Sequence, residues 1–127
     1  MLPLGGNVQL DCIGEPGPFR LAWLVDNDGR CIAREFFASR TDEEQDRTHI
    51  CFDHAKHGPP MGTFKALKGD MSGVYELRPT RQTTYFCFRY RDTFVITNGC
   101  WKRKDVVDAI HKRRARDLKL MFLEALT

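Results

Sequence analysis

Arginine and lysine are the side chains in this sequence with the clearest potential for chemistry, and they are unevenly distributed. Residues 65 to 127 contain fourteen Lys or Arg and seven Asp or Glu, whereas residues 1 to 64 contain six and ten. This asymmetry predicts a basic surface that faces a polyanion or an acidic protein partner, with a merely solvated basic face as the alternative. Oriented cations of this kind stabilise a phosphate that gains negative charge during a reaction.

Three cations of the basic half lie at or near the ends of predicted strands. Arg78 ends a predicted strand, Arg81 lies in the loop that follows, and Lys102 begins a basic run after the last predicted strand. For Arg78 the alternative is an ordinary ion pair with Glu76 on the same strand face. Seven further cations contribute to the same basic half: Lys65, Lys68, Arg103, Lys104, Lys112, Arg113 and Arg116.

Histidine and cysteine offer other chemistries, which the spacing does not favour. His49, Cys51, His54 and His57 lie within nine residues, but this spacing matches no familiar zinc module, and we expect no metal or other cofactor. His111, in the basic terminal segment, is a candidate proton shuttle. No pairing of a cysteine with a histidine and a third group indicates a catalytic thiol.

The elements that would position these residues follow from hydrophobic periodicity and from turn residues. Thr41 and Glu44 have the spacing of a capping box, which predicts the start of a helix. The expected elements are a strand over 19–25, helices over 32–39 and 42–57, strands over 74–78, 83–90 and 93–98, and a terminal helix from Asp105. The order β-α-α-β-β-β-α predicts an α+β fold with a small, mostly antiparallel sheet on which the helices pack.

Length and composition indicate one folded domain. The chain has 127 residues, and we expect a loose arm over residues 1–18 followed by a single domain over 19–127. No apolar run is long enough to span a bilayer, and the first residues lack the pattern of a secretion signal. The five scattered cysteines include no CxxC pair, which favours free thiols and a cytoplasmic location.

Several segments in a particular order resemble a known group of proteins. They are Trp23–Arg30, Arg34–Phe36, His57–Gly62, Phe64–Asp70, Val74–Pro79 and Asn98–Lys104. Together, over about residues 20 to 116, the sequence resembles the RelE/ParE superfamily of toxins. It is most similar to the HigB-like, phage-associated branch of type II toxin–antitoxin systems.

The resemblance implies a ribosome-dependent mRNA endonuclease that needs no metal. In such an enzyme the ribose 2′-OH attacks the adjacent phosphate on ribosome-bound mRNA. Arg78, Lys102 and Arg81 would then act on the scissile phosphate, and the seven further cations would bind RNA. The implied partner is a cognate antitoxin, often a helix-turn-helix protein. The alternatives are a ParE-like toxin that inhibits DNA gyrase, and a catalytically degenerate relative that binds nucleic acid or protein.

One departure from the family pattern bears on activity. Many HigB-like chains carry an arginine in the strand that here contains Thr83 and Thr84. Loss of an oriented cation costs roughly a hundredfold in rate. The resemblance therefore implies either that Arg78 or Arg81 contacts the scissile phosphate in its place, or that activity is reduced or lost.

Overall fold

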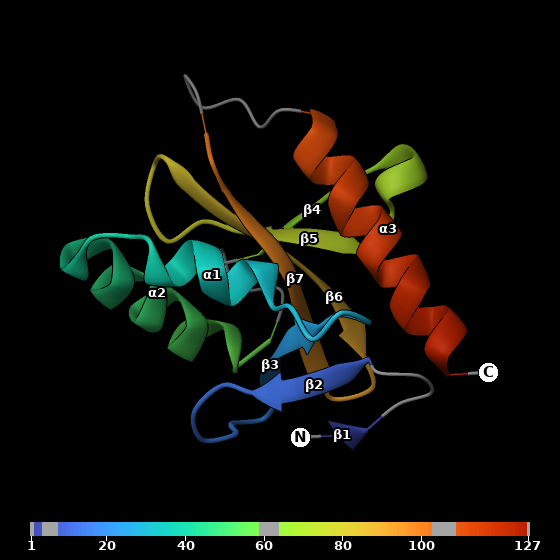
Figure 1. Ribbon diagram of the computed structural model, residues 1–127. Coiled ribbons are helices and arrows are strands. Elements are labelled where there is room, and N and C mark those ends of the chain that lie inside the picture. Colours follow the sequence, from blue (N-terminus) through green and yellow to red (C-terminus); the bar gives the residue numbers. More distant parts are fainter. Residues whose placement is uncertain (1, 4–7, 59–63, 103–108, 127) are drawn as a thin grey trace.

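The computed structural model describes residues 2–3, 8–58, 64–102 and 109–126. Within these ranges, the strands form one mixed sheet, and α-helices cover its two faces (Figure 1). The strands are β1 (Leu2–Pro3), β2 (Gln9–Cys12), β3 (Arg20–Val25), β4 (Phe64–Ala66), β5 (Val74–Leu77), β6 (Thr83–Tyr90) and β7 (Thr93–Trp101). The helices are α1 (Ile32–Ala38), α2 (Asp42–Ala55) and α3 (Ala109–Ala125), with a 3-10 turn over Gly69–Met71.

The sheet has the strand order β1-β2-β3-β7-β6-β5-β4. Strands β5, β6 and β7 form the predicted antiparallel meander. Strand β3 lies parallel to β7, and the other pairs of described strands are antiparallel. The α+β prediction is confirmed, with three strands (β1, β2 and β4) beyond those expected.

The helices divide the core between the two faces of the sheet. Helices α1 and α2 pack on one face through Ala33, Phe52 and Ala55, against sheet residues that include Tyr85 and Phe94. Helix α3 packs on the opposite face through Ala115 and Phe122. Figure 1 shows α1 and α2 on one side of the long strand β7 and α3 on the other. None of the described helices is both long and apolar enough to cross a bilayer.

The start of α2 is the predicted capping box. The Thr41 hydroxyl accepts a hydrogen bond from the Glu44 amide (3.1 Å), and the Glu44 carboxylate accepts one from the Thr41 amide (3.3 Å). These bonds satisfy backbone donors that the first helical turn leaves free. Helix α2 ends at Ala55, two residues before the predicted end at His57.

Strand β7 continues past the predicted end at Asn98 to Trp101. A Cβ at Gly99 would lie 2.6 Å from the ring of Phe36 and 2.9 Å from that of Tyr85. The glycine is therefore needed for the close approach of two aromatic rings and does not end the strand. As a result, Trp101 and Lys102 are held at the end of the sheet.

The expectation of a loose arm over residues 1–18 was wrong for Val8–Cys12. Strand β2 pairs along its whole length with β3, from Gln9 opposite Val25 to Cys12 opposite Ala22. Val8 and Leu10 are each only 1% exposed and pack with Phe122 of α3. This segment therefore contributes to the core, although Gly and Pro residues on both sides of it suggested a loop.

Candidate functional site

The three candidate catalytic cations line one open hollow at the end of the sheet. The hollow has a volume of about 420 Å³ and is lined by Arg47, Arg78, Pro79, Thr80, Arg81 and Lys102. We call it the cationic hollow. Four side chains of one charge around a concave surface raise the local concentration of anions and favour a bound phosphate.

Three of these cations lie at or near the ends of strands. Arg78 directly follows β5, Arg81 lies in the turn between β5 and β6, and Lys102 directly follows β7. The Lys102 amide donates a 2.6 Å hydrogen bond to the Gln82 carbonyl, which ties the end of β7 to that turn. The residues therefore converge because β5 and β7 flank β6 and end at the same edge of the sheet.

The turn itself is ordered by Thr80. Its hydroxyl accepts hydrogen bonds from the amides of Gln82 (3.2 Å) and Thr83 (3.0 Å) and lies 2.7 Å from the Thr83 hydroxyl. Such side-chain bonds to nearby amides stabilise a turn in place of a backbone ladder. Arg81 is thus presented from a defined loop conformation.

Arg78 is held by a buried carboxylate. Its guanidinium lies 3.3 Å from Oε2 of Glu76, and the ammonium of Lys65 lies 4.0 Å from the same oxygen. The Glu76 side chain is only 2% exposed, whereas that of Arg78 is 40% exposed. The ion pair anticipated as an alternative for Arg78 is therefore present, but its acidic member is buried and its basic member reaches the surface.

The other oxygen of Glu76 has a notable environment. Oε1 is buried, and the described part of the chain offers it no hydrogen-bond partner. A buried carboxylate oxygen without a partner costs stability, and such groups need a reason other than folding. Here the carboxylate fixes two cations near the edge of the cationic hollow.

Lys102 and Arg47 complete the hollow from different elements. Lys102 is only 4% exposed, an unusual burial for a lysine. Arg47 comes from α2 and forms an (i, i+4) ion pair with Glu43 at 3.2 Å. Sequence reasoning missed Arg47, because it appears as one charge on a polar helix, and only the packing of α2 beside the sheet brings it to Arg78.

The further RNA-binding candidates have different places in the structure. Lys65 lies beside the hollow through its contact with Glu76, and Lys68 is exposed before the 3-10 turn. The α3 residues Lys112, Arg113 and Arg116 are described but do not line the cationic hollow, and Arg116 lies 3.8 Å from Asp117. Arg103 and Lys104 lie outside the described residues, as does the predicted start of the terminal helix at Asp105.

All four histidines lie in the described ranges, and none of them lines the cationic hollow. His49 packs edge-on against Phe37, and the His111 carbonyl accepts a hydrogen bond from Asn98. Among the described residues, no three His, Cys, Asp or Glu side chains are grouped so as to hold a metal ion. The structure therefore brings no histidine to the predicted phosphate site.

The two threonines at the expected arginine position are buried. Thr83 is 1% exposed and Thr84 is fully buried, and its hydroxyl has no hydrogen-bond partner among the residues that the structure describes. Neither side chain adds a charge to the cationic hollow. The positive charge there comes from the two arginines beside the β5–β6 turn, from Lys102 and from Arg47.

The thiols are mostly inaccessible. Cys12 is exposed, whereas Cys31, Cys51, Cys87 and Cys100 are buried. Burial raises the pKa of Cys51 to about 12, opposed by a hydrogen bond from the backbone of Arg78. That contact also shows how closely α2 packs under the end of β5.

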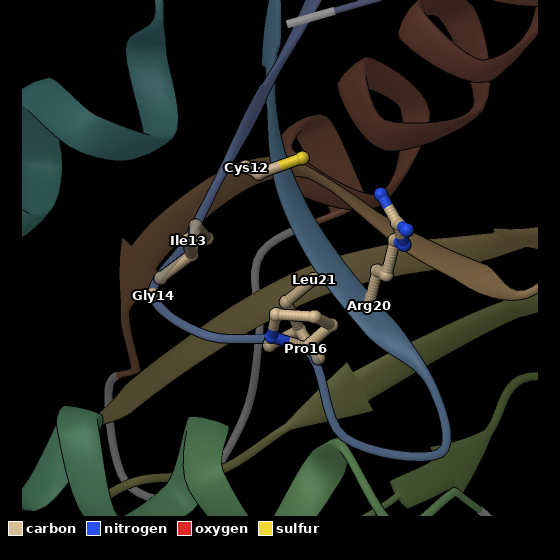
Figure 2. A pocket seen from close by; sticks show the side chains of 6 residues that line it. All are labelled: Cys12, Ile13, Gly14, Pro16, Arg20 and Leu21. Atoms are coloured by element: carbon tan, nitrogen blue, oxygen red, sulfur yellow. The ribbon is translucent and has the colours of Figure 1, made fainter.

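A second concavity lies between β2 and β3, far smaller than the cationic hollow. Its volume is about 40 Å³, and it is lined by Cys12, Ile13, Gly14, Pro16, Arg20 and Leu21 (Figure 2). This space accommodates little more than a water molecule. We therefore assign no ligand to it.

No protein-family description matches this sequence, and no curated protein matches it. Among solved structures, the chain is similar to a YoeB/ParE toxin from Agrobacterium tumefaciens. The identity is 18% and the TM-score 0.47, over 58% of this chain and 94% of that chain. At this level of similarity, the function has to be argued from the side chains of the site itself.

Proposed function

We propose that this chain is a type II toxin that cuts mRNA on the ribosome, in a HigB-like manner. The observation that carries the proposal is the convergence of Arg47, Arg78, Arg81 and Lys102 on one open hollow. Its shape and charge suit the phosphate of an extended nucleic acid strand.

The proposed reaction is a transesterification within the RNA. The ribose 2′-oxygen bonds to the adjacent phosphorus while the bond to the 5′-oxygen of the next nucleotide breaks. The 2′-hydroxyl gives up its proton and the leaving oxygen takes one up, which leaves a 2′,3′-cyclic phosphate and a 5′-hydroxyl. Arg78, Arg81 and Lys102 stabilise the extra negative charge on the phosphate in the transition state.

Glu76 acts in this proposal as a positioning residue for Arg78. Its side chain is too deeply buried to touch RNA, and its contact is with the guanidinium at 3.3 Å. A fixed guanidinium does not have to be reoriented as charge develops, which is the basis of electrostatic preorganisation.

The second candidate is a non-nuclease relative, either a gyrase inhibitor or a nucleic-acid or protein binder. It is favoured by Thr83 and Thr84, which add no charge where many HigB-like chains have an arginine. In either toxin reading, a cognate antitoxin, such as a helix-turn-helix protein, would neutralise the chain by binding it. Both toxin candidates would act in the cytoplasm, and only the first would act on ribosomes.

Primer extension on a defined mRNA in a purified translation system tests the proposal. We expect cuts within codons that require both ribosomes and this protein. Intact mRNA from a folded preparation would contradict it, and a DNA supercoiling assay would then test gyrase inhibition.

A further inference from the structure

Trp101 is an exposed aromatic side chain next to the cationic hollow. The chain has two tryptophans, of which Trp23 is 8% exposed and Trp101 is 46% exposed. Tryptophan is enriched at binding interfaces, because its ring combines a large apolar face with a polar edge. Base stacking on such rings contributes much of the affinity of proteins for single-stranded nucleic acids.

Trp101 lines a hollow of its own, which we call the aromatic hollow. It has a volume of about 350 Å³ and is lined by Thr41, Glu43, Glu44, Arg47, Thr80, Gln82 and Trp101. Arg47 and Thr80 also line the cationic hollow. The two hollows therefore adjoin, and an extended strand can lie across both.

The Trp101 ring is held in place from one side. The Arg40 guanidinium lies 5.4 Å from the centre of the Trp101 ring and 4.5 Å from that of Phe36. Two cation–π contacts to one guanidinium fix the orientation of the exposed ring. A preoriented ring loses little conformational entropy when a flat ligand stacks on it.

The remaining lining groups suit the edge of a base better than a phosphate. Glu43 and Glu44 bring carboxylates to the aromatic hollow, and Gln82 brings an amide. Glu43 is paired with Arg47, and Oε1 of Glu44 is occupied by Thr41. Carboxylates repel phosphates but accept hydrogen bonds from the amino and imino groups of bases.

We propose that the aromatic hollow is a nucleobase subsite, in which Trp101 stacks on a base whose edge donates hydrogen bonds to Glu43 or Glu44. Guanine fits best, because its edge presents two adjacent donors, N1–H and N2–H, to a carboxylate whose Oε1 already contacts Arg47 or Thr41. This inference rests on the proposed RNA substrate and adds a base preference next to the phosphate contacts.

Tryptophan fluorescence gives a direct test on the intact protein. Short oligoribonucleotides of equal length, UUGUU and UUUUU, are titrated at low salt, together with a form of UUGUU whose centre is abasic. We expect UUGUU to quench Trp101 most strongly. Trp101→Phe keeps a ring but leaves only the buried Trp23, so the quenching should disappear.

Binding of a labelled oligonucleotide, followed by anisotropy, separates stacking from charge. Trp101→Ala should weaken binding of UUGUU about tenfold and that of the abasic form little. Glu43→Gln should reduce the preference for UUGUU over UUUUU. Arg78→Ala should weaken binding of all three oligonucleotides alike.

The outcomes distinguish this inference from the proposed endonuclease. If Trp101→Ala binds all three oligonucleotides as the parent does, the base subsite is wrong even if mRNA is cut. If Trp101 is quenched with the expected preference but mRNA stays intact on ribosomes, the subsite stands and the endonuclease fails. If no oligonucleotide binds at low salt, the base subsite is overturned, and primer extension on ribosomes alone decides the endonuclease.

Discussion

At the scale of single residues, Arg78 and Lys102 differ from ordinary surface charges, because the first has a buried anion as its partner and the second is itself buried. Exposed ion pairs contribute little and leave both side chains mobile. Here Glu76 is 2% exposed and anchors Arg78, and Lys102 is 4% exposed beside the turn. The sequence predicted both cations as candidates and offered Glu76 as an ion-pair partner of Arg78, but it gave no sign that Glu76 is buried, because burial depends on the neighbouring strands and helices.

Arg78→Ala and Lys102→Ala should each lower the rate of mRNA cleavage about a hundredfold and relieve growth arrest, because each removes an oriented cation. Since Lys102 is buried, Lys102→Met is included to keep its packing. Arg20→Ala, at an exposed arginine of β3 that does not line the cationic hollow, is the matched control and should remain toxic. Parental toxicity in both folded hollow variants would show that the site is misassigned.

The effect of Glu76 should depend on Arg78. Glu76→Gln keeps the shape of the side chain but removes the ion pair, so we expect cleavage to fall about tenfold in the single variant. In an Arg78→Ala background the same change should have little further effect. Additive losses in this double-mutant cycle, measured by primer extension, would mean that Glu76 acts independently of Arg78.

The cysteines should differ sharply in reactivity. Because burial raises the pKa of Cys51 to about 12, its thiol stays protonated at pH 8 to 9 and is inert. The unfolded thiol ionises from about pH 9, so this burial makes the free energy of unfolding fall as pH rises above that value. A thiol reagent at pH 8 should label one cysteine, Cys12, in the folded chain and all five in denaturant. Rapid labelling of a second cysteine in the folded state would contradict the burial of that thiol, and labelling of Cys51 would contradict the packing of α2.

At the scale of elements, local signals predicted the parts of the fold whose cause is local. The capping box located the start of α2, and apolar alternation located β5 and β6. Strand β2 was missed because its stability comes from pairing with β3 and from contact with α3, neither of which is visible in four residues. The end of β7 was missed because Gly99 reads as a strand terminator unless the rings of Phe36 and Tyr85 are known to pack on it. That error also hid Trp101.

Leu10→Ala should lower the free energy of unfolding by about 2–4 kcal/mol, because Leu10 is 1% exposed in the core next to α3. Gln9→Ala, on the adjacent position of β2, should change it by less than about 0.5 kcal/mol. Urea unfolding of the two variants measures the difference. Equal stabilities would restore the interpretation of this segment as a loose arm.

At the scale of the whole molecule, the fold brings several positively charged side chains together although the net charge of the chain is small. The chain carries only +3 in total, yet four cations line one hollow. The cations of α3 belong to the opposite side of the core from α2, and they remain a candidate surface for ribosomal RNA or for an acidic antitoxin. The sequence predicted the basic second half but could not assign its charges to separate surfaces, since that depends on which strand ends meet.

The salt dependence of RNA binding should therefore be modest. If three or four phosphates are contacted, the logarithm of the association constant should fall with that of the salt concentration with a slope of about −2 to −3. Arg78→Ala should make this slope shallower by about 0.7. Anisotropy titrations at several salt concentrations measure both values, and an unchanged slope in the variant would exclude a phosphate contact by Arg78.

The parallel pairing of β3 with β7 has a consequence for the timing of synthesis. Arg20 to Trp23 of β3 cannot pair with β7 until Thr93 to Ile96, about seventy residues later in the chain, have been synthesised. Lys102 lies later still, so a ribosome must release most of the protein before the cationic hollow exists. If the chain cuts mRNA on ribosomes as proposed, it would thus be inactive towards the ribosome that is still making it, and the interval before the sheet closes would leave time for an inhibitor to bind.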